Sequence, residues 1–314
     1  MGEIDLNSFI NKQLKEWPLA AKNFADLSQV KTRRVYLTQN ETITIQFNPK
    51  RITSSIAKTD SQSLSCRPCL LCAKNRPLEQ LCIPFKSDYE ILINPFPIFP
   101  LHLTIADKNH KPQLIANRLG DMLDLTEELK NYIVFYNGPK CGASAPDHFH
   151  FQAGKKGLLP IESEETNIEK VTIFSDKDIS VEASDNYLRK FIIIKSKDNE
   201  KIESCAKKIF TSMLTLNKTI EEPMINLLAG KEKEIKKLYI FPRSAHRPKQ
   251  FYANEPQKIL FSPASVDFGG LLITPRKSDF AKLNKQLITD LLKQVTLSDN
   301  NWKSLLKYLR YNEF

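Results

Sequence analysis

The order of predicted elements constrains the fold of this chain most, because strand, helix, strand, strand occurs twice, about ninety residues apart. In each copy, the helix carries apolar side chains at steps of three and four, the spacing of a single helix face. The first copy comprises 101–106, the helix face of Leu119, Met122, Leu125 and Leu129, 132–136 and 148–153. The second comprises 191–194, the helix face of Ile202, Ala206, Ile209 and Met213, 224–228 and 238–241. This pattern predicts an α+β fold of two similar halves, each an antiparallel sheet with packed helices.

Further elements surround the two copies. Residues 6–30 have an amphipathic helical pattern, and 35–46 alternate around a central turn as in a hairpin. The tail from about Lys277 again has a helical period. The two copies barely match in sequence, so the repeat rests on pattern alone. We predict one unit over 1–165 and a second, degenerate unit over 166–314 that contributes to substrate binding.

Composition is that of an ordinary globular protein. Of the 314 residues, 41% are hydrophobic and 26% are charged. No apolar run is long enough for a membrane span, and the N-terminus lacks the basic start and apolar stretch of a secretory signal. We therefore expect a cytoplasmic protein with no membrane partner.

The formal net charge of +10 has three readings: nucleic-acid binding, an anionic small substrate, or solubility alone. Much of the charge is diffuse lysine, as in 231–237, and no basic stripe is interleaved with aromatic residues. The sequence therefore argues against a nucleic-acid partner.

The segment Asp147-His148-Phe149-His150-Phe151-Gln152-Ala153 carries the most chemistry. If it is a strand, His148, His150 and Gln152 project from one face and the two phenylalanines from the other, into a core. A histidine can attack phosphorus and form a covalent intermediate, provided that a partner fixes its tautomer and donors neutralise the transferring group. The alternative is that these are ordinary surface or core histidines, which the glycine-containing turns just upstream make less attractive.

These residues resemble a known signature. Asn137-Gly138, Gly142-Ala143-Ser144 and His148-x-His150-x-Gln152 are similar to the active site of the histidine triad superfamily, and Asn94 to His102 resembles its upstream motif. The nearest branch has His-x-His-x-Gln and includes galactose-1-phosphate uridylyltransferase, diadenosine tetraphosphate phosphorylase and GDP-L-galactose phosphorylase. The resemblance covers roughly 66–155, and 267–270 is only loosely similar to the C-terminal half of the phosphorylases. It implies two histidine-triad-like halves.

The resemblance also implies roles. His150 would be the nucleophile toward the nucleotide's α-phosphorus, with His148 as its supporting neighbour. Gln152 would contact the phosphoryl oxygens or the leaving group and favour transfer over hydrolysis. Ser144 and the neighbouring backbone, including Gly142, would hold a phosphate. Asn137 would contact the nucleotide or phosphate. One departure is that the spacing from Ser144 to His148 is one residue longer than the family pattern.

A metal site is the second chemical expectation. Four of the six cysteines cluster as Cys66, Cys69, Cys72 and Cys82. In some uridylyltransferases a structural zinc lies between Cys-x2-Cys, a later histidine and the first histidine of His-x-His. The resemblance therefore implies zinc ligands at Cys69, Cys72, His110 and His148. The alternative is that the cysteines are small buried residues. His102 is expected to be structural.

Further basic residues are candidates for substrate binding. Arg51 and Lys58 flank a Ser/Thr-rich stretch, and an ordinary polar loop is an equal alternative. In the second half, Arg243 and Arg247, with His246 and Lys249, could face an acceptor phosphate, or could be exposed without a role.

The sequence thus predicts an enzyme, a nucleotidyltransferase or a nucleotide-sugar or dinucleotide phosphorylase with a nucleotidyl-histidine intermediate. Its substrates would be a nucleotide sugar or dinucleoside polyphosphate, with phosphate or a sugar phosphate as acceptor. A histidine triad hydrolase and a non-enzymatic nucleotide- or RNA-binding protein are the alternatives. A homodimer is compatible with the sequence, which leaves the base, the sugar and the oligomeric state open.

Overall fold

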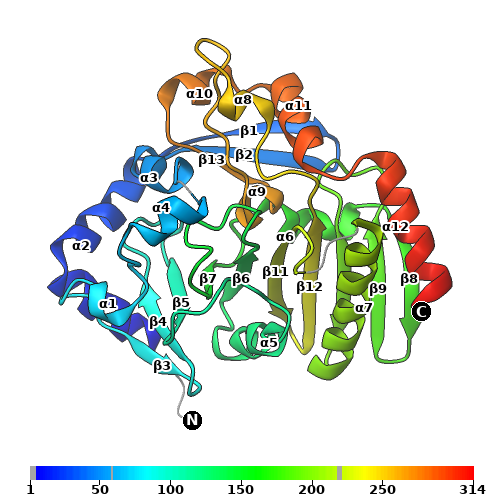
Figure 1. Ribbon diagram of the computed structural model, residues 1–314, viewed down its shortest axis with the longest axis horizontal. Coiled ribbons are helices and arrows are strands. Elements are labelled where there is room, and N and C mark those ends of the chain that lie inside the picture. The colour runs from blue at the N-terminus through cyan, green and yellow to red at the C-terminus, as the bar shows by residue number, and fades with distance from the viewer. Residues whose placement is uncertain (1–4, 58, 218–220) are drawn as a thin grey trace.

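A computed structural model describes residues 5–57, 59–217 and 221–314. Its centre is one ten-stranded antiparallel sheet with the order β3-β4-β5-β7-β6-β11-β12-β10-β9-β8 (Figure 1). The strands are β3 (Ile83–Phe85), β4 (Tyr89–Ile93), β5 (Leu103–Asp107), β6 (Tyr132–Asn137), β7 (His150–Lys155), β8 (Lys170–Asp176), β9 (Ile179–Ser184), β10 (Ile192–Ser196), β11 (Ile225–Glu232) and β12 (Ile235–Pro242).

The strand order confirms the predicted repeat of strand, helix, strand, strand, and it shows how the two halves are joined. Outward from the middle, β6-β7-β5-β4-β3 is matched by β11-β12-β10-β9-β8, so each half has the same internal order. The halves join through β6 and β11, which pair antiparallel from Asn137 with Asn226 to Val134 with Ala229. Two sheets were predicted, and the structure has one continuous sheet.

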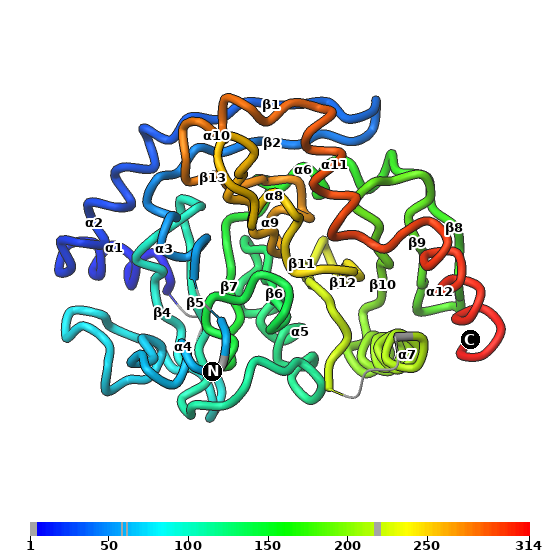
Figure 2. The backbone as a smooth tube through the Cα atoms, turned by 45° about the horizontal axis from the view of Figure 1, so that its top comes forward, coloured from blue at the N-terminus to red at the C-terminus, as the bar shows by residue number. Residues whose placement is uncertain are grey.

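A small second sheet lies above the large one (Figure 2). The predicted hairpin forms it as β1 (Lys31–Thr38) and β2 (Glu41–Phe47), which pair antiparallel. On the other side of β2, β13 (Leu271–Thr274) adds in parallel. A strand from near the C-terminus thus pairs with one from near the N-terminus, and the predicted division at residue 165 stays a prediction.

The helices cover both faces of the large sheet. They are α1 (Leu6–Glu16), α2 (Pro18–Ala25), α3 (Ile52–Ser55), α4 (Ser61–Ser65), α5 (Leu119–Glu128), α6 (Pro160–Glu164), α7 (Asn199–Asn217), α8 (Lys249–Tyr252), α9 (Ser265–Phe268), α10 (Lys277–Lys282), α11 (Lys285–Val295) and α12 (Asp299–Asn312). The apolar stripes of α5 and α7 pack on one face, in a core that includes Phe149 and Phe151. On the opposite face, Phe268 of α9 packs with Phe135 and Phe241.

Local sequence signals explain the C-terminal helices. The side chain of Asn284 accepts a hydrogen bond from the N–H of Leu287 at 2.9 Å and caps α11. Ser298 caps α12 in the same way through the N–H of Asn301 at 3.2 Å. The caps separate α11 from α12, so the helical tail turns between them. Among the described residues, no helix has the length and apolar character needed to cross a membrane.

Candidate active site

The histidine segment enters the sheet at His150, where β7 begins. Phe149 and Phe151 point into the core as predicted, and their rings meet edge to face at 4.9 Å. His148 precedes the strand, so the prediction that it shares a strand face with His150 and Gln152 is wrong. The peptide N–H of His148 bonds instead to the carbonyl of Ala145, in a turn.

His150 is held as a neutral nucleophile would be. Its ring is almost fully buried, and Nδ1 lies 2.8 Å from the carbonyl oxygen of His148. A carbonyl can only accept, so Nδ1 carries the proton and Nε2 keeps its lone pair. Burial lowers the pKa of His150 to about 4, against the opposing effect of the His148 carbonyl, so the ring is neutral near pH 7.

The backbone around His150 is fixed by Gln113, a fully buried residue that sequence reasoning missed. The Gln113 amide oxygen accepts from the His150 N–H at 2.8 Å, and its nitrogen donates to the His150 carbonyl at 2.9 Å. The same nitrogen donates to the carbonyl of Asn137 at 3.1 Å. One side chain thus joins β7 to the turn after β6. An isolated glutamine in a loop gives no sequence signal of this kind.

Gln152 is oriented by His102. The N–H of Ile98 donates to His102 Nδ1 at 3.3 Å, so the ring proton lies on Nε2. Nε2 donates in turn to the Gln152 amide oxygen at 3.0 Å. Burial, aided by the charge of Arg51, lowers the pKa of His102 to about 3 and keeps this ring neutral. Because the amide oxygen accepts this bond, the NH₂ group of Gln152 is the end of the side chain that can donate to a ligand. His102 has the structural role that was expected.

The glycine turn is supported by the second half. Gly142 has φ of +91°, and a Cβ there would lie 2.8 Å from the carbonyl oxygen of Pro263 and from the Cβ of Ala264. The side-chain oxygen of Asn137 accepts from the N–H of Ser265 at 2.7 Å. The turn therefore packs against the start of α9.

The lengthened turn between Ser144 and His148 is held by Arg67. Asp147 receives a hydrogen bond from Arg67 at 3.4 Å, and its other oxygen lies 3.6 Å from His110 Nε2. Arg67 also donates to the carbonyl of Ser144 at 2.9 Å. Its buried Nε has no hydrogen-bond partner among the described residues. Arg67 ties the lengthened turn to the cysteine loop. The sequence reading missed it because a single arginine beside cysteines is not distinctive.

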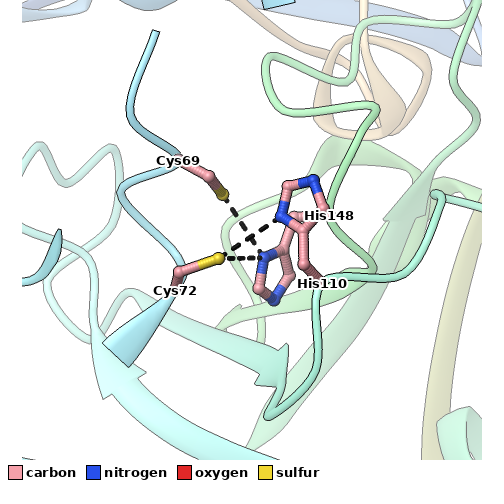
Figure 3. Close-up of side chains that lie close together, drawn as sticks. All are labelled: Cys69, Cys72, His110 and His148. Atoms are coloured by element: carbon pink, nitrogen blue, oxygen red, sulfur yellow. Dashed lines mark hydrogen bonds between the residues drawn. The ribbon is translucent and has the colours of Figure 1, made fainter. Parts of the chain in front are cut away.

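The four predicted metal ligands come together (Figure 3). Their donor atoms all lie within 4.8 Å of one another, with Cys69 Sγ and Cys72 Sγ 3.3 Å and 3.5 Å from His148 Nδ1. Cys72 Sγ is also 3.3 Å from His110 Nδ1. Two sulfurs and two imidazole nitrogens are a donor set suited to tetrahedral zinc. Cys66 and Cys82 are exposed and lie outside this cluster.

The surroundings of His148 favour metal binding. Its Nε2 lies 2.7 Å from the carbonyl oxygen of Asp107, so the proton sits there and Nδ1 faces the sulfurs with its lone pair. Although burial acts in the opposite direction, a hydrogen bond from the protonated His148 ring lowers the pKa of the Cys69 thiol to about 6, and a metal ion would take the place of that Nδ1 proton. The cluster thus offers a thiolate and an oriented imidazole.

The basic candidates separate into two groups. Arg51 donates to the carbonyl of Phe96 at 2.9 Å and acts electrostatically on His102, so it lies beside the active site. Arg247 donates to Ser262 at 2.9 Å and to the carbonyl of Ala57 at 3.1 Å, bridging the halves. Lys58 lies outside the described residues.

The prediction that Arg243 faces an acceptor phosphate is wrong. The residue is fully buried, and all five N–H donors of its guanidinium are engaged within the protein. Its acceptors are the side chain of Asn226 and the carbonyls of Pro263, Val295, Ala245 and His246. No donor is left for an acceptor phosphate, so Arg243 braces the loops of the second half.

Comparison with known proteins agrees with this geometry. Residues 9–155 match a family model described as a domain of unknown function (DUF4922), and 160–311 match the model "GDPGP1-like, C-terminal domain". No curated protein matches the sequence significantly. Yeast Ap4A phosphorylase Apa2 superposes with a TM-score of 0.61 at 17% identity, covering 89% of this chain and 96% of the yeast chain. This chain has the fold of the yeast phosphorylase, and its C-terminal half matches the GDPGP1-like domain.

Further structures of the same yeast enzyme show the same likeness of fold. Its complex with Ap4A has a TM-score of 0.60 at 16% identity, covering 91% of this chain and 97% of that one. Its complex with AMP has a TM-score of 0.55 at 17% identity, covering 91% and 96%. The expected α+β fold is thus confirmed, and the fold and the GDPGP1-like C-terminal match both agree with the expected resemblance.

Proposed function

We propose that this protein is a nucleotidyltransferase or nucleotide phosphorylase that works through a covalent nucleotidyl-His150 intermediate. The observation that carries the proposal is the ring of His150, neutral and held by its Nδ1 so that Nε2 is the nucleophilic atom. The proposed substrates are dinucleoside polyphosphates or nucleotide sugars. The structures of the yeast enzyme with Ap4A and with AMP support this class.

The reaction proceeds as two displacements at one phosphorus. His150 Nε2 attacks the α-phosphorus, a P–N bond forms, and the P–O bond to the leaving phosphate breaks with its electron pair on oxygen. An oxygen of the acceptor phosphate then attacks the same phosphorus and breaks the P–N bond, which regenerates neutral His150. The Gln152 amide donates to the phosphoryl oxygens in both steps.

Other residues support these steps by charge and shape. Arg51 and Arg67 offset the negative charge of the phosphates. The turn that contains Gly142 and Ser144 holds a phosphate through its backbone N–H groups. Asn137 fixes that turn against α9 through its side-chain oxygen.

Phosphate dependence tests the reaction class. With Ap4A and inorganic phosphate in ¹⁸O-labelled water, we expect ADP and ATP without ¹⁸O in either product, since phosphate oxygen attacks phosphorus. Mass spectrometry of the nucleotides measures this. AMP that carries ¹⁸O, formed equally well without phosphate, would identify a hydrolase instead. Repeating the assay with UDP- and GDP-sugars identifies the base and the leaving group.

We also propose that Cys69, Cys72, His110 and His148 hold a structural zinc ion, which supplies no chemistry but braces the strand that presents His150. Purified protein should contain about one zinc ion per chain by elemental analysis. The double substitution Cys69→Ser and Cys72→Ser should remove it and lower thermal stability, because metal binding contributes folding free energy. Matched substitutions at the exposed Cys66 and Cys82 should leave the metal content unchanged. Protein free of zinc and as stable as its Cys69/Cys72 variant would contradict the site.

A further inference from the structure

A large cleft lies away from the His150 site. It has a volume of about 1000 Å³ and is lined by the tip of the β1–β2 hairpin, the chain just after β9, and helices α11 and α12. Figure 1 shows where these elements lie. β9 is five strands from β7 in the sheet, which corresponds to about 24 Å at the usual strand spacing. The cleft is therefore a separate site.

Cations from two helices face this cleft. On α11, Lys285 and Lys293 are eight residues apart, so they lie on the same helix face. On α12, Lys303, Lys307 and Arg310 follow at steps of four and three, again on one face. All five residues are exposed and line the cleft.

Few carboxylates balance this charge. Within residues 5–57, 59–217 and 221–314, the four lysines of the two helices have no ion pair. The acidic residues in the lining are Glu41, Asp185 and Asp299. Glu41 is buried against Arg189, and Asp299 pairs with Lys190 at 2.9 Å. The cleft thus has a surplus of positive charge that is open to an anionic ligand.

The floor of the cleft is apolar. Leu188, Leu297, Trp302 and Leu306 line it, and Tyr311, whose exposed fraction is 78%, also contributes to its wall. A ligand that fits such a cleft has an apolar, flat part for the floor and several negative charges for the lysines. A nucleotide has both parts, because its base is flat and apolar and its phosphates are negatively charged.

We propose that this cleft binds a nucleoside polyphosphate at a second site, separate from the one at His150. Its volume is at the upper end for small-ligand pockets. Single-stranded nucleic acid needs a series of exposed aromatic platforms, whereas Tyr311 is the one exposed aromatic residue in the described lining. A small ligand therefore suits the cleft better than a polymer.

Tryptophan fluorescence can report on the cleft directly. The chain has two tryptophans, Trp17 near the opposite edge of the sheet and Trp302 in the cleft floor. In a Trp17→Phe background, ATP should change the Trp302 emission in a saturable manner. Lys303→Glu with Lys307→Glu should weaken this binding by about tenfold or more, because two attractive charges become repulsive. The matched variant Lys12→Glu with Lys15→Glu, on exposed positions of α1, should bind as before.

Comparison ligands and unmodified protein complete the test. Inorganic tripolyphosphate should bind more weakly than ATP, because it places nothing on the apolar floor. In equilibrium dialysis of chains that keep Trp17, Lys303→Glu with Lys307→Glu should bind one ATP per chain fewer than the wild type and should still form the His150 adduct. Failure of the adduct alone would count against the proposed function and not against the cleft.

Three results would overturn the proposal. These are an unchanged Trp302 emission with ATP, an ATP response that persists in the Lys303/Lys307 variant, and binding only of an oligothymidylate of about 20 nucleotides. Tripolyphosphate binding as tightly as ATP would contradict the assignment of a nucleotide.

Discussion

Replacing His150 with glutamine is expected to lower nucleotidyl turnover by about four orders of magnitude or more, since the covalent route is lost with the nucleophile. Glutamine fills similar space, so the buried position at the start of β7 stays occupied. Steady-state kinetics with Ap4A and phosphate measures the loss. Alanine at the same position should give the same result.

The effect should lie in chemistry rather than in folding or binding. Far-UV circular dichroism and the melting temperature of His150→Gln should stay close to those of the wild type, and AMP should still bind. A variant that folds normally and keeps more than about a hundredth of wild-type turnover would mean that His150 is not the nucleophile.

Replacing Arg189 with methionine is expected to destabilise the fold by about 3–5 kcal/mol, because one partner of a buried ion pair is removed. Arg189 and Glu41 are both buried, with Nε 3.0 Å from the carboxylate. Arg189 also bonds to Glu164 of α6 at 2.9 Å and to the Phe268 carbonyl of α9 at 3.1 Å. It therefore joins the hairpin and two helices to the second half.

Thermal denaturation measures this prediction, with Tm expected to fall by roughly 5–10 °C. Glu41→Gln added to Arg189→Met should recover part of the loss, because it removes the stranded charge. Lys201→Met, which breaks an exposed ion pair with Asp178, is the control and should change Tm little. If Lys201→Met and Arg189→Met lowered Tm equally, the buried ion pair would contribute no more to stability than the exposed one.

The sequence predicted the local elements well because their apolar periods are strong. The hairpin, the two core helices and the strands around the His-x-His segment all form where the periods place them. Pairing between distant elements was not predicted. An apolar strand such as β6 has the same pattern at a sheet edge as in the middle, so its contact with β11 leaves no local trace.

In the candidate site, too, the residues of a recognisable motif were predicted, and those that act through distant contacts were not. Cys69, Cys72, His110 and His148 could be named through a resemblance, and their side chains meet. Gln113 and Arg67 act through contacts with chain segments far away in sequence, so neither had a recognisable spacing. Arg243 was misassigned for a related reason: a basic residue in a loop reads as exposed, whereas folding buries this one among carbonyl groups.

Intact-protein mass spectrometry of the enzyme mixed with Ap4A in the absence of phosphate detects the nucleotidyl-His150 intermediate itself. We expect a mass increase of one AMP on the wild-type chain, located by peptide mapping at His150, lost in acid and discharged by added phosphate. We expect no such increase in His150→Gln. A chain that turns over Ap4A without ever carrying the nucleotide, or that carries it on another residue, would show that His150 is not the nucleophile.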